Sequence, residues 1–366
     1  MRSESCSAIA APQSPSRRSQ TDYFAGIDVS LETANVCIVN GDGAVVLEQK
    51  VSAEPKDIDA VLKVFGKPLK RLGLEAGPTS SWLFSELRAA GHPALCLECR
   101  HVKAGLGAMR NKTDRNDARG IAHLVRLGWF RVVHVKSDEA QQIRMLLVNR
   151  GLLLSKLQDI ENSVRGSLKV FGLKLGRVTK HSFEARVLEL VEGRPALAAI
   201  TAPMLRVRRI LMDEFAHLDR MARKLARHDA ICRRLMTVPG VGVIVALTYR
   251  TGIDVPERFQ RSRDVGAHFG LTPRRYSSGQ IDYDGHISRC GDEMVRTALY
   301  QAAHVLMHHG RWCGLRGWAM RIAKRSGAKL AKVALARKLA VILHRMWIEG
   351  TEFRWTTGVR TGAQAA

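Results

Sequence analysis

The chain has 366 residues, enough for two or three domains around a large core. It carries 58 Lys and Arg against 34 Asp and Glu, so its formal net charge is +24. Because this charge is spread over the whole length, the phosphate backbone of nucleic acid is the favoured partner. An anionic membrane surface is the weaker alternative, since no long uncharged apolar run could enter a bilayer.

Seven cysteines are scattered along the chain, an odd number that favours a reduced, intracellular protein. Cys96 and Cys99 form a single C-x-x-C without a second pair at zinc-finger spacing, so we interpret them as structural. Residues 1–22 are rich in Ser, Arg and Pro and lack the apolar segment of a secretory signal. They are predicted to be a disordered extension.

The region 23–137 alternates strand and helix signals. Three strands joined by tight turns are followed by alternating helices and strands, which is the order of a ribonuclease-H-like α/β domain with a mixed sheet. In such a fold the first strand runs through the middle of the sheet and the fourth lies beside it. Strands are predicted at 24–30, 34–40, 44–50, 71–75 and 93–97, and helices at 55–66, 79–90 and 112–128.

Four carboxylates of this region form the candidate site. Asp28 ends the first strand and Glu75 the fourth, so adjacent strands would carry them toward one side. Asp114 and Asp117 stand three apart in a first helical turn, so both leave the same helical face. Alone, such a pair is explained as well by acids completing a helix dipole, and each strand acid by a turn. Together the four would supply oxygen ligands for Mg²⁺ or Mn²⁺, and two such ions support phosphoryl transfer.

Residues 138–236 change in character, because strand signals vanish and apolar residues recur mostly at three- and four-residue steps. We predict an antiparallel helical or coiled-coil arm. Its simplest role is a spacer, and its positive balance of charge adds dimerisation and binding of a nucleic-acid backbone.

A turn with two glycines, Gly240 and Gly242, precedes an apolar helix at the start of the region 237–350. This is the pattern of a helix–hairpin–helix, whose glycines let backbone amides approach a phosphate closely. A plain tight turn explains the same residues equally well.

A polar loop is predicted at 271–279. It places Ser277 and Ser278 beside Arg274 and Arg275, where the arginines could hold a phosphate while a serine attacks it. A serine that merely forms part of a turn is the alternative. Helices at 292–309 and 328–348 close this region, and the tail 351–366 is predicted to be disordered.

These motifs resemble a known family. The matching residues are Gly26-Ile-Asp28-Val, Glu75, Lys112-Thr-Asp114-Arg-Asn-Asp117-Ala, Val238-Pro-Gly-Val-Gly242, Pro273 through Gly279, and Gly285 through Asp292. Over residues 23–350 the chain is similar to the DEDD transposases of bacterial insertion sequences, the IS-one-ten family, whose members are recombinases guided by a bridge RNA. The resemblance implies a RuvC-like domain (23–137), a coiled-coil arm (138–236) and a C-terminal transposase domain (237–350).

The resemblance also implies roles for particular residues. Asp28, Glu75, Asp114 and Asp117 would bind Mg²⁺ and act on the DNA phosphodiester, while Ser277 would form a covalent link to the DNA end. Ser278 is the alternative residue for that covalent link. Candidate contacts with nucleic acid are Lys112, Arg115, Gly240, Gly242, Arg274 and Arg275.

The implied partners are donor and target DNA, a structured guide RNA that pairs with both, and further copies of the chain in a dimer or tetramer. The implied location is the bacterial cytoplasm, with the nucleoid. One departure from the family is the segment 280–284, which is more acidic than the basic stretch expected there.

Two other functions remain open. A RuvC-like, metal-dependent, structure-selective DNA endonuclease would need the four acids and leave Ser277 without a chemical role. A non-catalytic nucleic-acid scaffold is disfavoured, because a scaffold need not retain all four acids.

Overall fold

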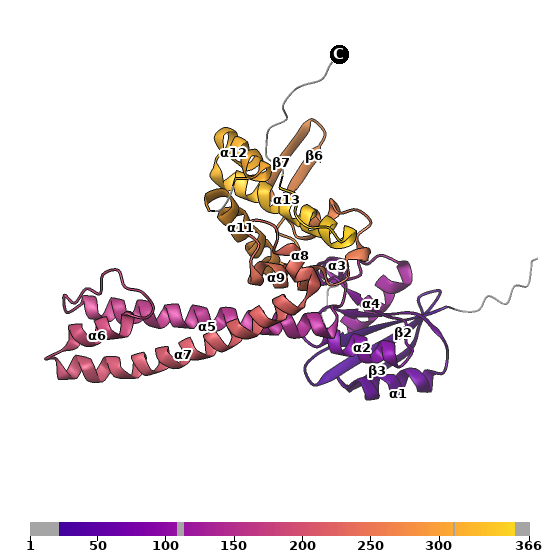
Figure 1. The fold of residues 1–366 in the computed structure, drawn as a ribbon. Helices are drawn as coiled ribbons and strands as arrows, with labels where there is room; N and C mark the ends of the chain where they lie inside the picture. The colour runs from indigo at the N-terminus through magenta and orange to yellow at the C-terminus, as the bar shows by residue number, and fades with distance from the viewer. Residues whose placement is uncertain (1–21, 108–112, 310–311, 356–366) are drawn as a thin grey trace, which may run out of the picture. The chain divides into compact units, whose positions relative to one another are not determined.

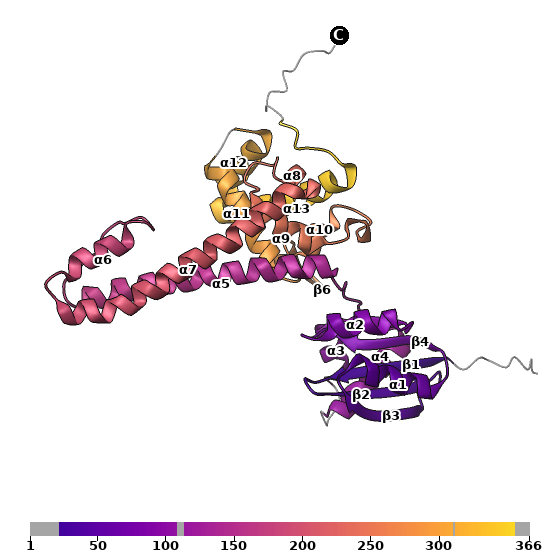
Figure 2. The ribbon, with the colours of Figure 1, turned by 60° about the horizontal axis from the view of Figure 1, so that its bottom comes forward.

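The computed structural model describes residues 22–107, 113–309 and 312–355. Apart from Asp22, the predicted extension 1–22 lies outside these residues, and so does the part 356–366 of the predicted tail. The chain divides into two compact units, residues 1–135 and 136–366 (Figures 1 and 2). Among the described residues, no helix combines the length and apolarity needed to cross a membrane.

The first unit is built on a five-stranded sheet in the order β3-β2-β1-β4-β5. β1, β2 and β3 pair antiparallel, whereas β4 is parallel to both β1 and β5. The predicted mixed sheet, with its first strand central and its fourth strand beside it, is confirmed. The strands are β1 Tyr23–Val29, β2 Thr33–Asn40, β3 Val45–Ser52, β4 Leu69–Glu75 and β5 Ala94–Leu97.

In the described part of this unit, four helices cover the sheet. They are α1 Pro55–Phe65, α2 Ser80–Ala89, α3 Cys99–Leu106 and α4 Asp114–Leu127. One apolar cluster joins the sheet to α1 and α2 and contains Ile27 of β1. A second cluster joins the other face to α3 and α4 and contains Phe24 of the same strand. Because side chains alternate along a strand, even-numbered residues of β1 point toward α4. The short α3 was missed by the sequence prediction.

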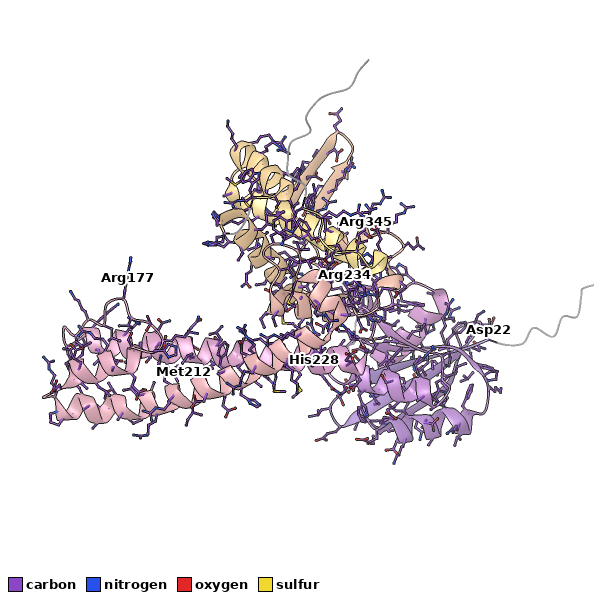
Figure 3. All side chains as sticks on the ribbon, viewed as in Figure 1. Asp22, Arg177, Met212, His228, Arg234 and Arg345 are labelled. Atoms are coloured by element: carbon purple, nitrogen blue, oxygen red, sulfur yellow. The ribbon has the colours of Figure 1, made fainter. Side chains whose placement is uncertain are left out.

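The second unit begins with two long helices. These are α5 Asp138–Lys169 and α7 Pro195–His228, with α6 Phe183–Val191 between them in sequence. α5 and α7 lie side by side in both views, and Figure 3 labels Met212 on α7. Buried or half-buried residues follow alternating steps of four and three on each helix, the spacing typical of a coiled coil. They include residues 143, 147, 150, 154, 157, 161, 164 and 168 of α5, and 201, 205, 208, 212, 215, 219, 222 and 226 of α7.

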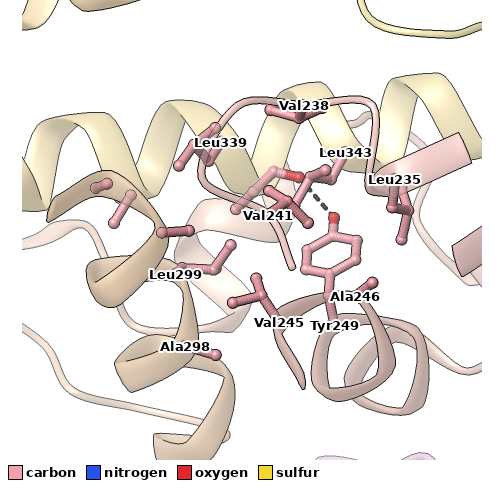
Figure 4. Packing of buried hydrophobic residues seen from close by; sticks show 14 of the residues in the cluster. Leu235, Val238, Val241, Val245, Ala246, Tyr249, Ala298, Leu299, Leu339 and Leu343 are labelled. Atoms are coloured by element: carbon pink, nitrogen blue, oxygen red, sulfur yellow. Dashed lines mark hydrogen bonds between the residues drawn. The ribbon is translucent and has the colours of Figure 1, made fainter. Parts of the chain in front are cut away.

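A helical bundle with one large apolar core forms the rest of this unit. Tyr249 is fully buried there, and its hydroxyl donates a hydrogen bond of 2.6 Å to the carbonyl of Ala340 (Figure 4). The helices are α8 Ala230–Leu235, α9 Val243–Ile253, α10 Asp264–His268, α11 Glu293–His308, α12 Gly314–Ser326 and α13 Ala328–Glu349, with a 3-10 turn at Pro256–Arg258.

The polar loop predicted at 271–279 is wrong. Residues Pro273–Ser278 form strand β6, which pairs antiparallel with β7, Ile281–Ile287. Tyr276 faces Tyr283 across the pair, and their rings stack at 5.1 Å between centroids. Gly279, with φ +57°, begins the two-residue turn that joins the strands. Cross-strand aromatic pairing and a glycine turn therefore make a hairpin from residues whose polarity predicted a loop.

Candidate functional site

Two of the predicted acids lie side by side at the ends of β1 and β4. Ile27 pairs with Leu74, and Asp28 and Glu75 are the next residues on the two parallel strands. Ile27 and Leu74 are buried in the core against α1 and α2. Strand alternation therefore turns Asp28 and Glu75 toward the opposite face, which α4 covers, and both are half-buried.

The helix α4 crosses this face in close contact with β1. A Cβ added at Gly26 would stand 2.3 Å from the carbonyl oxygen of Ala118, so only glycine lets the helix backbone approach so closely. Near the other end of α4, the Arg126 guanidinium donates to the carbonyl of Gly41, in the turn that follows β2 beside the start of β1. The helix thus runs opposite to β1, and its first turn lies toward the end of the strand that carries Asp28.

That first turn contains Asp114, which is exposed, and Asp117, which is half-buried. Thr113 is the N-cap, because its side chain accepts a hydrogen bond from the amide of Asn116. Neither aspartate is therefore needed as the cap. Asp114 and Ala118 are four residues apart, so the helical face that touches β1 continues to Asp114.

Asp28 and Glu75 end adjacent strands, and the first turn of α4, with Asp114 and Asp117, lies toward the same end of β1. Among the described residues, no group of three or more His, Cys, Asp or Glu side chains is close enough together to hold a metal ion. The chemistry of the donors nevertheless fits a hard divalent cation, which prefers carboxylate oxygens. Two donors come from adjacent strand ends and two from one helical turn.

Glu48 of β3 is a further residue of this region that the sequence did not reveal. One of its carboxylate oxygens accepts hydrogen bonds from Arg115 Nε, at 2.7 Å, and from Nη2, and the other accepts from Arg119 Nε at 2.9 Å. Burial acts to raise the pKa of Glu48, but the bonds from Arg115 and Arg119 hold it below its usual value. Glu48 thus ties the first two turns of α4 to the sheet. Only knowledge of how the strands pair could have identified Glu48 as part of this region.

A cavity of about 300 Å³ adjoins the ion pair of Glu48 and Arg115. Its lining includes Asn35, which pairs with Asp28 on the neighbouring strand, and the cationic residues Lys50 and Arg115. The cavity therefore offers positive charge close to the predicted acids. Lys112, the other predicted contact here, lies outside the described residues.

Cys99 is the immediate neighbour of Glu75. Its thiol donates to the carbonyl of Ala76 at 2.7 Å, and burial, followed by the charge of Glu75, raises its pKa. Cys96 is buried, and burial raises the pKa of its thiol as well. Both are free thiols, and that of Cys96 meets the hydroxyl of Ser80 in α2, the helix on the opposite face of the sheet.

The predicted serines lie in the second unit, on the hairpin. Ser277 is exposed on β6 and pairs with Asp282 of β7. The acidic departure at 280–284 supplies that aspartate, whose two oxygens accept hydrogen bonds of 2.9 and 2.6 Å from Arg275. Arg274 donates to the carbonyl of Ser288, and Ser278 pairs with Ile281 at the turn. Ser277 is therefore held on a paired strand opposite Asp282.

The two glycines before α9 have different surroundings. Gly240 has φ +86°, and a Cβ there would stand 2.4 Å from the carbonyl oxygen of Ala302 on α11, so packing alone requires glycine. Gly242 is the N-cap of α9, with φ −95° and open space where a Cβ would be. Of the two, only Gly242 leaves the helix start open to a phosphate.

Comparisons with known proteins agree along the chain. The family model of DEDD IS110 transposases matches residues 25–172, and the model described as "Transposase IS116/IS110/IS902 family" matches residues 232–316. The transposase for insertion sequence element IS1111A of Coxiella burnetii is 30% identical over 338 residues, which cover 89% of this chain and 90% of that relative. A probable family 20 transposase of Pseudomonas aeruginosa is 30% identical, with 77% and 85% covered.

Among solved structures, Thermus thermophilus RuvC in complex with a Holliday junction substrate matches with a TM-score of 0.24 and 14% identity, covering 31% of this chain and 99% of that one. The identity to the insertion-sequence relatives extends across both units, from the sheet that carries the acids to the bundle that carries the serines. The chain belongs to the IS110 family of DEDD transposases and is an enzyme of DNA transposition.

Proposed function

We propose that this transposase cleaves and rejoins DNA strands with a divalent cation, Mg²⁺ or Mn²⁺, held by Asp28, Glu75, Asp114 and Asp117. One observation carries the proposal. The β1–β4 register places Asp28 beside Glu75 on the face under α4, whose first turn supplies the other two acids. A bound cation would polarise the phosphate and stabilise charge on the leaving oxygen.

The chain's own residues have distinct tasks in this proposal. The four carboxylates hold and orient the cation. Lys50 and Arg115, at the cavity beside them, attract the DNA backbone. Arg115 remains tied to Glu48, which fixes its orientation.

We further propose that Ser277 is the nucleophile, with Ser278 as the alternative. Its hydroxyl oxygen attacks the phosphorus, a new Oγ–P ester forms, and the oxygen of the departing strand leaves and takes a proton as a hydroxyl. A hydroxyl of the joining strand then reverses this step. Exposure of Ser277 on a paired strand supports access by a DNA end.

A structured guide RNA and assembly into a dimer or tetramer complete the proposal. The net charge of +24 supports binding of more than one nucleic-acid strand. Sequencing the RNA that co-purifies with the protein tests the guide, because a recurring structured RNA is expected.

The test of the metal site compares two aspartates in first helical turns. Asp117→Asn should abolish strand cleavage in Mg²⁺, whereas Asp57→Asn, an exposed acid in the first turn of α1, should leave it unchanged. Cleavage of labelled element ends is measured together with DNA binding. Cleavage by Asp117→Asn at the wild-type rate would show that the metal assignment is wrong.

The serine is tested by trapping the protein–DNA adduct under denaturing conditions. Ser277→Ala should lose both the adduct and the joined product, while Ser278→Ala should keep both. If Ser277→Ala still joins strands and Ser278→Ala does not, the nucleophile is Ser278. If both variants cleave normally without any adduct, the chain acts as a metal-dependent endonuclease.

A further inference from the structure

A cavity of about 610 Å³ lies in the second unit between α12, α13 and the segment after α13. It contains none of the residues assigned above to cleavage or joining. Its wall combines aromatic and aliphatic side chains with positive charge. The apolar residues are Leu315, Trp318, Ile342, Met346 and Phe353, and the cationic residues are Arg321, Lys338, Arg345 and Arg354.

Lys338 and Trp318 are in direct contact. The ammonium nitrogen of Lys338 stands 4.1 Å from the centroid of the indole ring. Burial lowers the pKa of Lys338, and the neighbouring Arg321 guanidinium lowers it further. Within the described ranges, no ion pair joins either Lys338 or Arg321 to a carboxylate. An anion that enters beside two like charges favours the charged form of both.

The acidic residues of the cavity wall are too few to balance its cationic residues. Glu349 is paired with Arg345 at 2.5 Å, and Glu352 is the other acid of the lining. Four cationic side chains thus face two carboxylates. Once Arg345 is paired with Glu349, Arg321, Lys338 and Arg354 face the single carboxylate of Glu352, and Lys338 lies against the indole of Trp318.

We propose that this cavity binds one unpaired nucleotide of a nucleic-acid strand, with its base against Trp318 and Phe353 and its phosphate at Lys338 and Arg321. Aromatic surface beside positive charge is the combination that holds single strands, because every base has a face that can stack and every link carries a phosphate. The volume falls in the range of small-ligand pockets. The inference extends the proposed function to a second place on the chain, and it needs neither the metal nor the serine.

The test measures the affinity of the full-length protein for a short labelled oligonucleotide in three forms: single-stranded DNA, single-stranded RNA and blunt duplex DNA. Lys338→Gln and Trp318→Leu should each weaken single-strand binding about tenfold or more while changing duplex binding much less. Lys329→Gln is the matched control, because Lys329 is an exposed lysine of the same helix that does not line the cavity. It should affect all three forms slightly and equally.

If the cavity variants lose affinity for single-stranded DNA, the nucleotide belongs to DNA. If they lose affinity for single-stranded RNA, it belongs to RNA. Wild-type single-strand affinity in Lys338→Gln would overturn the proposal, and so would equal losses for single-stranded and duplex forms. Thermal denaturation of each variant checks folding. If Trp318→Leu unfolds, Arg321→Gln replaces it, because Arg321 is an exposed residue of the cavity wall. Strand cleavage by Lys338→Gln in Mg²⁺, measured beside that of Asp117→Asn, distinguishes failure of the cleavage chemistry from failure of this site.

Discussion

The carboxylate of Glu48 occupies an unusual position for a single side chain, because both of its oxygens are taken by arginines of one helix. Arg115 binds one oxygen and Arg119 the other, and the Glu48 side chain is only 12% exposed. A charge-assisted bond of this kind contributes more than a neutral one. Glu48 therefore acts on the predicted site through the position of α4.

Glu48→Gln should lower the free energy of unfolding by about 1–3 kcal/mol at neutral pH, because two charged hydrogen-bonding partners lose their anion. The pKa of Glu48 is lowered in the folded protein, so its stabilisation is present above the unfolded-state pKa and is lost as pH falls through the folded-state value. Urea denaturation across the acidic range measures both effects. Glu32→Gln, an exposed glutamate of the same unit, is the control. A difference from wild type that stays constant down to the lowest pH would contradict this account.

At the scale of elements, single contacts decide how helices approach. α11 presses against the turn before α9 at Gly240, and α4 presses against β1 at Gly26. Both contacts place backbone against backbone, where no side chain can move aside.

Gly240→Ala should destabilise the protein by about 1–3 kcal/mol or more, since alanine meets both a positive φ and the carbonyl of Ala302. Gly242→Ala is the matched control and should change the melting temperature little. If the start of α9 binds a phosphate, Gly242→Ala should still weaken duplex binding. Equal thermal stability of the two variants would show that the contact with α11 does not require glycine at position 240.

The long helices of the second unit are joined by two ion pairs across their contact. Arg150 meets Asp219 at 2.6 Å, and Arg208 meets Glu161 at 2.8 Å with its side chain only 2% exposed. Because each pair is satisfied in one alignment of the helices, we infer that the pairs set the register.

Exchange of the first pair tests this register. Arg150→Asp alone should cost about 1–3 kcal/mol, because it puts a like charge beside Asp219, which keeps its pair with Arg223 of the same helix, and adding Asp219→Arg should restore part of the loss. A double-mutant cycle from urea denaturation gives the coupling energy. Additive effects of the two changes would mean that the pair has no role in alignment.

At the scale of the whole molecule, the net charge of +24 is the dominant property. Basic side chains occur on different parts of the second unit, as Arg177, Arg234 and Arg345 show in Figure 3. Such a distribution attracts nucleic acid before any specific contact forms.

Duplex binding should therefore depend steeply on salt. If the protein makes about 6–10 phosphate contacts, affinity should fall by roughly 10³–10⁵ between about 50 and 200 mM salt. Fluorescence anisotropy at several salt concentrations gives the slope, and Arg274→Gln should reduce it if that residue binds a phosphate. A slope near zero would show that charge does not drive binding.

Local pattern alone determined much of this protein. Short apolar segments joined by tight turns predicted the five strands of the sheet, and the helix predicted at 112–128 corresponds to α4, because these signals lie within a few residues of each other. The same signals placed the four acids at the ends of their elements. α3 was missed, and the hairpin β6–β7 was taken for a loop, because its pairing depends on a partner strand rather than on the polarity of 273–279.

Contacts between residues far apart in the sequence come from the tertiary structure. It fixed the register in which Asp28 and Glu75 follow the paired Ile27 and Leu74, on strands that β2, β3 and α1 separate in sequence, brought Glu48 to the arginines of α4, and assigned Gly240 to packing and Gly242 to an open helix start. It also formed the cavity of Trp318 and Lys338 from two helices and the segment that follows them. The reason is physical: composition and periodicity report the environment of each residue, whereas contacts between elements arise from packing that no local segment contains.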